Sequence, residues 1–462
     1  MAVRIVDRER ELRQLRSIAA APPALVVLRG RRRVGKSFLL RVALPGERLV
    51  SYQAEENPQP LQLEVFAAEC ARLIPGAPEL RFANWDDALA FIEAQAREQG
   101  PLTVVIDEFQ RVAAREESIE SKIQNAWDRW DHENVPIALV LSGSALSFMA
   151  GLFQGGKPTH GRSILRPLLH PLSYRDIAAF GPDGLTPVEL VERFSVLGGT
   201  PQYLRWAAQR PLDEVIEDLI LSPDAPLYDD PEHLIREEEN IRDPGPYFGI
   251  MEAIARGYTD PTAIGGKLQI GSQLTTKFLN RLAELAYVTK VEPQEPGHSG
   301  AARAYWKISD PYFRFWFGRV LPNRSRLSRG RIKEVAREIH KALPQITSFV
   351  YEDVCREWIG RCAELGADAD ELGSWWSRKS DTEIDVVALN HDGYSVLGSC
   401  KWSSRPVGPA VLDDLYAAKS MLGPKAAQAR LVIFSKSGFK DELRLRAEQE
   451  TVVLAEVDDL FT

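Results

Sequence analysis

The sequence contains little cysteine and no long apolar run. Its four cysteines among 462 residues are scattered and lack the paired spacing of a zinc site. This usage favours a reduced intracellular chain over a disulfide-stapled secreted one. No apolar run approaches the ~18 residues of a membrane-spanning helix, and the first fifteen residues are charged, without a signal-like apolar core. We therefore expect a cytoplasmic protein that does not enter a membrane.

The composition is that of an ordinary globular protein, with 44% hydrophobic and 26% charged residues. At ~100–200 residues per domain, this length predicts two to four domains. The net charge of −8 argues against general attraction to nucleic acid. The charge is uneven, however, because acids dominate residues 210–243 and cations dominate residues 303–341. The basic segment is either a nucleic-acid surface or a solvated linker and helix, and the sequence leaves both open.

A glycine-containing loop near the N-terminus has the pattern of a phosphate-binding loop. Residues 24–28 form an apolar run that suits a strand buried on both faces, and a helix is expected to begin at Ser37. Backbone N–H groups of such a loop surround phosphates, and the helix dipole favours negative charge there. Lys36 would reach the β- and γ-phosphates, and Ser37 would hold Mg²⁺. The candidate nucleotide-binding residues of this loop are Gly30, Arg31, Arg32, Arg33, Val34, Gly35, Lys36, Ser37 and Phe38.

Two further apolar runs end in polar residues. Residues 102–106 lead into Asp107 and Glu108, which would bind Mg²⁺ and polarise the attacking water, respectively. Residues 136–141 lead into Ser142-Gly143-Ser144. We expect Ser144 to lie beside the γ-phosphate and Glu108 as a sensor, although a plain turn would look the same.

With these motifs the first half of the chain resembles the archaeal-type ATPases of the AAA+/STAND group. The resemblance also rests on an acidic-Arg-Glu box at residues 6–12, Gly161-Arg162, a Pro-Leu-Ser-Tyr segment at 171–174 and a Gly-Gly-Thr-Pro segment at 198–201. It implies that Asp7 and Arg8 lie near the adenine and that Pro201 belongs to the nucleotide site. Arg162 is either an arginine that compensates phosphate charge, in cis or from a second subunit of an oligomer, or a structural ion-pair partner.

Residues 244–320 have the pattern of a winged helix. We expect helices at 251–256, 261–268 and 273–285, the last one capped by Ser272 with Leu274 on its apolar face, and then strands at 287–291 and 304–308. The third helix would be the recognition helix. A protein-interaction module or an ATPase lid remains an equal alternative. The aromatic segment 310–317 favours a packing connector over a base-stacking surface. The exposed face of the third helix would carry Gln273, Thr276, Lys277, Asn280 and Arg281.

From about residue 347 the pattern resembles the restriction-endonuclease-like domain that such ATPases carry. Helix 349–358, strands 383–389, 394–402 and 430–434, and helix 411–421 are expected. Glu352, Asp385 and Lys401 fall where such a nuclease needs them, but Ser399 stands where the family has a second acid. Serine is a poor Mg²⁺ ligand beside a carboxylate. Glu383 could substitute, because alternate strand residues share a face. We expect a site that has lost cleavage.

Together these patterns predict an α/β multidomain chain that uses ATP and Mg²⁺. The hydrolysis of ATP would serve a DNA-associated activity. The alternative is a nucleotide-dependent signalling switch that binds a protein partner and carries an inactive nuclease-like domain. The expected boundaries are an ATPase core at 1–180, a helical lid at 181–243, a winged helix at 244–320, a basic linker at 321–346 and the nuclease-like domain at 347–462.

Overall fold

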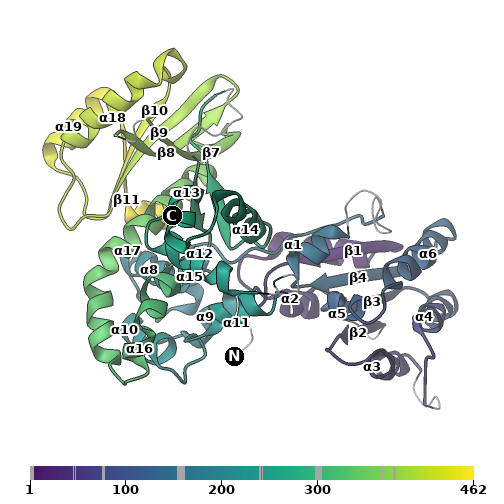
Figure 1. Ribbon diagram of the computed structural model, residues 1–462. Coiled ribbons are helices and arrows are strands. Elements are labelled where there is room, and N and C mark those ends of the chain that lie inside the picture. Colours follow the sequence, from purple (N-terminus) through teal and green to yellow (C-terminus); the bar gives the residue numbers. More distant parts are fainter. Residues whose placement is uncertain are drawn as a thin grey trace. The chain divides into compact units, whose positions relative to one another are not determined.

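The chain divides into two compact units, which we describe separately (Figure 1). Unit 1 comprises Met1–Leu172 and Thr200–Gln202, and unit 2 comprises Ser173–Gly199 and Tyr203–Thr462. The structure is a computed structural model. It describes residues 5–44, 46, 48–74, 79–152, 162–238, 241, 243–296, 304–366, 368–377 and 381–462.

Unit 1 is built on a parallel four-stranded sheet in the order β1-β4-β3-β2 (Figure 1). These strands are β1 (Ala24–Arg29), β2 (Leu49–Gln53), β3 (Leu102–Asp107) and β4 (Ile137–Gly143). Three of the four are almost wholly buried, as their continuous apolar runs predicted. Because β4 lies between β1 and β3, its carboxyl end adjoins both the loop after β1 and the acids after β3. The predicted P-loop NTPase sheet is confirmed.

Helices cover both faces of this sheet. Val26 and Leu28 point to a core shared with α1 (Glu9–Ala19) and α2 (Lys36–Ala43). Leu25 and Val27 point to the opposite, larger core. The alternation follows from the two-residue period of a strand. The larger core is closed by α3 (Gln59–Ala71), α4 (Trp85–Gln99), α5 (Phe109–Ala113), α6 (Ile119–His132) and α7 (Leu146–Gly151).

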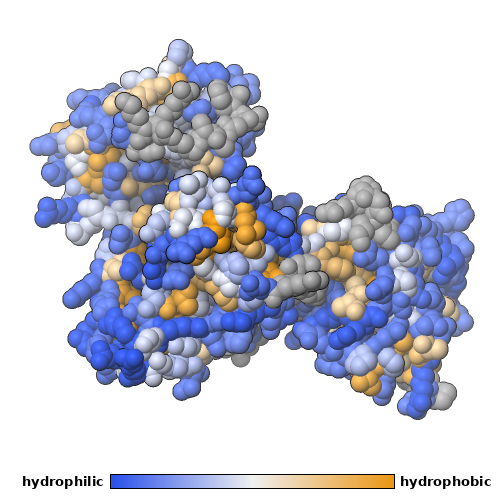
Figure 2. Space-filling view, in the orientation of Figure 1, coloured by the Kyte–Doolittle hydropathy of each residue, from blue (hydrophilic) through white to orange (hydrophobic). Residues whose placement is uncertain are grey.

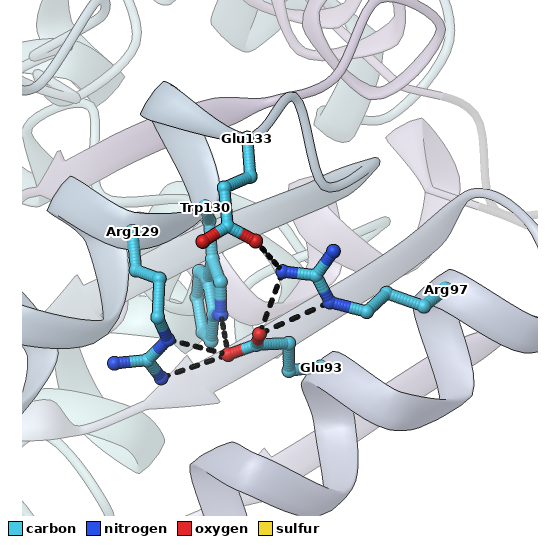
Figure 3. Close-up of polar contacts among 5 residues, drawn as sticks. All are labelled: Glu93, Arg97, Arg129, Trp130 and Glu133. Atoms are coloured by element: carbon cyan, nitrogen blue, oxygen red, sulfur yellow. Dashed lines mark hydrogen bonds and ion pairs between the residues drawn. The ribbon is translucent and has the colours of Figure 1, made fainter.

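A charged network fixes α6 against α4 (Figure 3). Glu93 on α4 accepts hydrogen bonds from Arg97, from Arg129 at 2.8 and 3.0 Å, and from the Trp130 indole at 2.9 Å. Burial raises the pKa of Glu93, but the hydrogen bonds from Arg129, Arg97 and Trp130 outweigh it and leave the pKa below its ordinary value. Arg97 also pairs with Glu133. The network holds the ionised carboxylate where the two helices meet.

Unit 2 begins with helices that follow the ATPase sheet in the chain. They are a 3-10 turn at Asp176–Phe180, α8 (Pro187–Leu197), most of α9 (Pro201–Trp206), α10 (Leu212–Glu214), a π-helical segment at Val215–Leu221 and α11 (Asp230–Arg236). Helix α8 starts in a complete capping box between Thr186 and Glu189.

The next segment contains α12 (Gly245–Ala255), α13 (Pro261–Leu268) and α14 (Ser272–Glu284). The antiparallel pair β5 (Val288–Val291) and β6 (Tyr305–Ile308) follows. This is the element order that a winged helix requires, although the winged-helix assignment itself stays a prediction. Two details predicted for the third helix were wrong. Ser272 is the first helical residue rather than the cap, which is Gly271, and Leu274 is 44% exposed because Thr275 takes the buried position.

An aromatic connector and a long helix lead to the C-terminus. The buried aromatics of α15 (Pro311–Phe315) and of the π-helical segment Trp316–Val320 confirm that residues 310–317 pack internally. Two short helices, Leu321–Asn323 and α16 (Arg324–Leu327), precede α17 (Ile332–Arg361). The boundary expected between residues 346 and 347 falls inside α17, so one helix joins the basic segment to the C-terminal sheet.

The C-terminal part of unit 2 holds a mixed five-stranded sheet in the order β11-β10-β9-β8-β7. β7, β8 and β9 pair antiparallel, whereas β9, β10 and β11 pair parallel. One core lies under α18 and α19, and the other packs on α8 and α17. The elements are β7 (Glu371–Trp376), β8 (Glu383–Asn390), β9 (Gly393–Lys401), α18 (Ala410–Met421), β10 (Arg430–Ser435), α19 (Asp441–Glu450) and β11 (Val453–Glu456), with 3-10 turns at Gly423–Ala426 and Val457–Phe461.

The outer surface is mainly polar. Hydrophilic residues dominate the face seen in Figure 2, with scattered apolar side chains between them. Within the described part of the chain, no helix is both long enough and apolar enough to cross a membrane.

Candidate nucleotide-binding site

The loop between β1 and α2 is shaped by two glycines. A Cβ atom added at Gly30 would lie 2.9 Å from the carbonyl oxygen of Leu169 and 2.9 Å from Val34 Cγ2. Gly35 adopts φ 96° at the N-cap of α2, a conformation that other residues rarely take. The sequence therefore forms the tight turn that presents backbone N–H groups at a helix N-terminus.

Lys36 lies over this loop and is 5% exposed. Its Nζ donates hydrogen bonds to the carbonyl oxygens of Gly30, at 2.8 Å, and Arg31, at 3.2 Å. Burial lowers the pKa of Lys36, and the charges of Glu108 and Asp107 partly oppose that shift. The ammonium group is thus held at the loop, where an anion would stabilise its charge.

Ser37 and Asp107 meet across the site. Ser37 Oγ donates to Asp107 Oδ2 at 2.5 Å, which joins the start of α2 to the end of β3. A hydroxyl and a carboxylate oxygen side by side are the donors that Mg²⁺ takes beside a bound triphosphate. Together with the tight turn formed by Gly30 and Gly35, the oxygens of Ser37 and Asp107 fit a nucleotide bound with Mg²⁺.

Glu108 follows Asp107 in the left-handed conformation, with φ 53°. Its Oε2 accepts a hydrogen bond from Ser144 Oγ at 2.6 Å and another from Gln110. Burial raises the pKa of Glu108, but the charge of Lys36 and the bonds from Ser144 and Gln110 outweigh it, so the pKa is lowered. The structure thus brings together Glu108 and Ser144, which the sequence placed on different strands. It adds Gln110, whose sequence position gave no signal of this contact.

The other loop residues differ in exposure. Arg33 is exposed, with φ 68°, as expected for a loop that binds through its backbone. Arg31 and Arg32 are half-buried. Val34 is buried, and Phe38 is half-buried at the start of α2.

The residues expected near the adenine lie in unit 1. Asp7 is exposed, with φ 49°, whereas Arg8 is 9% exposed and donates to the carbonyl oxygen of His170 at 2.5 Å. Burial and the nearby Arg8 charge lower the pKa of His170. Pro201 is the first residue of α9 and falls among the three residues that return to unit 1. Their contacts with a nucleotide stay predictions.

Arg162 forms a two-pronged ion pair with Asp128 on α6. Its Nε lies 2.5 Å from Asp128 Oδ1, and its Nη2 lies 2.9 Å from Oδ2. This hydrogen bond is the main cause of the lowered pKa of Asp128. The pair favours the structural interpretation of Arg162 over the phosphate-contacting one. Gly161, the other half of that motif, lies outside the described residues.

The four residues of the expected nuclease site come from three elements of unit 2. Glu352 is on α17, Glu383 and Asp385 are on β8, and Lys401 ends β9. Asp385 Oδ2 accepts hydrogen bonds from the backbone N–H of Cys400, at 2.6 Å, and from Ser399 Oγ, at 3.1 Å. The serine that replaces an acid therefore donates to the remaining aspartate instead of supplying a second charge.

The pKa values of the two glutamates of this cluster are raised, which favours their neutral forms. Burial and then the neighbouring Asp385 raise the pKa of Glu352 to about 7. The same two causes, burial first, raise the pKa of Glu383. Among the described residues, no group of three or more His, Cys, Asp or Glu side chains is arranged to hold a metal ion. The charge of Asp385 acts on both glutamates, so the three acids lie near one another, and the loss of the metal site stays a prediction.

The sheet order and the site geometry define a P-loop NTPase. Residues 5–206 match a family model described as an ATPase domain predominantly from Archaea. Residues 316–410 match a second model, described as archaeal and bacterial proteins of unknown function. Residues 5–206 are thus similar to an archaeal-type ATPase domain, and a second matched region follows them. No curated protein matches the chain significantly.

Several solved structures are similar to this chain at low identity. A Walker-type ATPase of Pyrococcus abyssi is 19% identical, with 68% of this chain and 96% of that chain covered, at a TM-score of 0.49. The ORC2 protein of Aeropyrum pernix, solved as ADPNP-ADP complexes, is 15% identical, with 71% and 98% covered, at 0.43. A STAND protein of Pyrococcus horikoshii with a tetratricopeptide repeat sensor is 14% identical, with 76% and 49% covered, at 0.28.

Proposed function

We propose that unit 1 hydrolyses ATP with Mg²⁺. The observation that carries this proposal is the contact of Ser37 with Asp107 at the carboxyl edge of the sheet, directly beside Lys36. It is supported by the match of residues 5–206 to an ATPase domain. Steady-state ATP hydrolysis by the wild type and by Lys36→Ala tests the proposal, and equal rates would contradict it.

Each side chain has a separate task in this proposal. Lys36 neutralises charge on the β- and γ-phosphates, and Ser37 with Asp107 holds the metal, which supplies charge stabilisation when it is bound. Glu108 accepts a hydrogen bond from the attacking water and orients it. The hydrogen bonds and the Lys36 charge that lower its pKa support this role, because they keep the carboxylate ionised as an acceptor.

We further propose that ATP turnover serves a DNA-associated activity through unit 2. The support is the helix and strand order of α12 to β6 and the cations beyond it. On α14, Lys277 and Asn280 are exposed, whereas Arg281 pairs with Glu284 at 2.6 Å. Exposed cations also gather at the start of α17 and just before it. These are Arg329, Arg331, Lys333, Arg337 and Lys341.

Contacts within unit 2 limit which surface DNA can reach. The backbone N–H of Gln294, beyond β5, donates to the carbonyl oxygen of Ser374 at 2.9 Å. On β6, Lys307 pairs with Asp353 at 2.6 Å, and the Tyr305 ring lies 5.2 Å from that of Trp376. Because the β5-β6 hairpin is attached to strand β7 and to the C-terminal half of α17, the proposal assigns DNA contact to α14 and the start of α17.

We expect duplex DNA binding to weaken steeply with salt, because phosphate contacts release counterions. Lys277→Ala is expected to reduce the slope of log K against log[salt] by about 1, the effect of losing one phosphate contact. Fluorescence anisotropy with a labelled duplex at several salt concentrations measures it. Arg115→Ala, which removes an exposed cation from unit 1, is the matched control and should leave the slope unchanged. A flat slope for the wild type would remove the DNA proposal.

The second candidate is a nucleotide-dependent switch that binds a protein partner. The observation that favours it is the hydrogen bond from Ser399 to Asp385, which replaces a metal ligand with an internal contact. The net charge of −8 points the same way. Nucleotide-dependent capture of a protein together with no salt-dependent DNA binding would select this candidate.

We expect the C-terminal sheet not to cut DNA, since its acids are paired or shifted toward neutrality. Supercoiled plasmid incubated with the wild type and Mg²⁺ or Mn²⁺ should stay intact on an agarose gel. Nicking that disappears in Asp385→Ala but persists in Asp392→Ala, an exposed acid at the β8-β9 turn, would show an active nuclease instead.

A further inference from the structure

Gln110 is a buried glutamine whose amide has no task in the ATPase proposal so far. It is the second residue of α5 and is 3% exposed. Its Nε2 donates to Oε2 of Glu108 and, at 3.3 Å, to Oγ of Ser144. Ser144 donates to the same Oε2 at 2.6 Å. Donors from two different elements therefore converge on one oxygen of Glu108.

The other carboxylate oxygen of Glu108 is free to accept. None of the residues that the structure describes donates a hydrogen bond to its Oε1. Two donors on Oε2 restrict rotation of the carboxylate about the last side-chain bond. The direction in which Oε1 accepts is therefore set by Gln110 and Ser144.

Packing alone does not account for an amide at this position. A Cβ atom on Gly143 would lie 2.5 Å from Oε1 of Gln110 and 2.5 Å from Sδ of Met149. The Gln110 side chain therefore fits beside the end of β4 because residue 143 is a glycine. Oε1 of Gln110 is nonetheless buried with no hydrogen-bond partner in the described structure. A leucine would fill the same space without an unpaired oxygen, and unpaired buried acceptors are disfavoured. The Nε2 donor of the amide is therefore the feature that a glutamine supplies here and a leucine does not.

We infer that Gln110 is a positioning residue for ATP hydrolysis: with Ser144 it fixes one oxygen of Glu108 and leaves the other to orient the attacking water. The inference rests on the proposed role of Glu108. Gln110 acts through Glu108 and does not touch the nucleotide. Its loss should therefore slow turnover and leave nucleotide affinity unchanged.

Gln110→Leu tests this against a matched control in the same unit. Gln95 on α4 is also buried, at 6% exposure, and its Oε1 is likewise unpaired, so Gln95→Leu makes the same chemical change away from the site. We expect kcat to fall about 10- to 100-fold in Gln110→Leu, the usual effect of losing a residue that orients a functional group. KM for ATP, the Kd of a fluorescent ATP analogue and Tm should stay within the range of Gln95→Leu.

Two results would overturn the inference. One is a kcat within twofold of the wild type, and the other is a loss of analogue binding as large as the loss of kcat. If Gln110→Leu does not fold, Gln110→Met replaces it, because its unbranched side chain has a similar length but no N–H to donate to Glu108. The same slow turnover with intact binding is expected. Wild-type hydrolysis no faster than Lys36→Ala would defeat the ATPase proposal itself. Hydrolysis that depends on Lys36 and Glu108 but not on Gln110 would defeat only this inference.

Discussion

Lys36→Ala is expected to lower ATP turnover by about 10³-fold or more, to the background of the assay. The ammonium is buried at the loop and donates hydrogen bonds to two loop carbonyls, so its removal takes away a charge that the loop holds in place beside the phosphates. Nucleotide affinity should fall with turnover, because the lysine contacts phosphate in the bound state as well as during the reaction. Phosphate release and the binding of a fluorescent ATP analogue measure the two effects.

Arg41→Ala is the control for this variant. Arg41 is an exposed cation on the same helix, α2, so the change removes one positive charge without touching the loop. We expect its turnover and affinity to match the wild type. Turnover in Lys36→Ala equal to that of Arg41→Ala would show that the loop does not bind the phosphates.

The second large effect is expected in Glu108→Gln. Turnover should fall about 10²- to 10⁴-fold, the usual contribution of a group that orients or deprotonates the attacking water. ATP binding should persist, since Lys36, Ser37 and Asp107 remain in place. The variant should therefore hold ATP without consuming it, which equilibrium binding and single-turnover hydrolysis distinguish.

Glu98→Gln makes the same substitution at an exposed position on α4 and is expected to behave as the wild type. If Glu108→Gln instead lost ATP binding, Glu108 would belong to the binding set and its water-orienting role would be wrong. If its turnover stayed normal, another group would orient the water.

Three of the four strands of unit 1 were readable from the sequence because they are continuous apolar runs that end in polar motifs, whereas β2, which alternates between buried and exposed residues, was not predicted. Their parallel pairing then brings Ser37, Asp107, Glu108 and Ser144 to one edge of the sheet. In unit 2, β8, β9 and β10 were predicted, whereas β7 and β11 were not located. The segment that became β7 contains a glycine and bulges against β8, and β11 has only four residues. Neither gives a clear period-two signal.

Contacts that depend on three-dimensional space were not predictable. The amide of Gln110 reaches Glu108 because Glu108 turns into the left-handed conformation and Gly143 leaves room beside it. The ion pair of Arg162 with Asp128 likewise joins residues from separate elements. The hydrogen bond from Ser399 to Asp385 likewise appears only in three dimensions, and the loss of cleavage at this site stays a prediction. The cytoplasmic location and an oligomer with Arg162 acting in trans stay predictions.

The central claim is that a Lys36-dependent ATPase in unit 1 is coupled to DNA contact in unit 2. It is tested most directly by steady-state ATP hydrolysis at low salt, with and without duplex DNA, in the wild type and in Lys36→Ala. The account predicts hydrolysis that rises with DNA in the wild type and stays at background in the variant. Wild-type hydrolysis that is absent, or that DNA leaves unchanged, would contradict the claim.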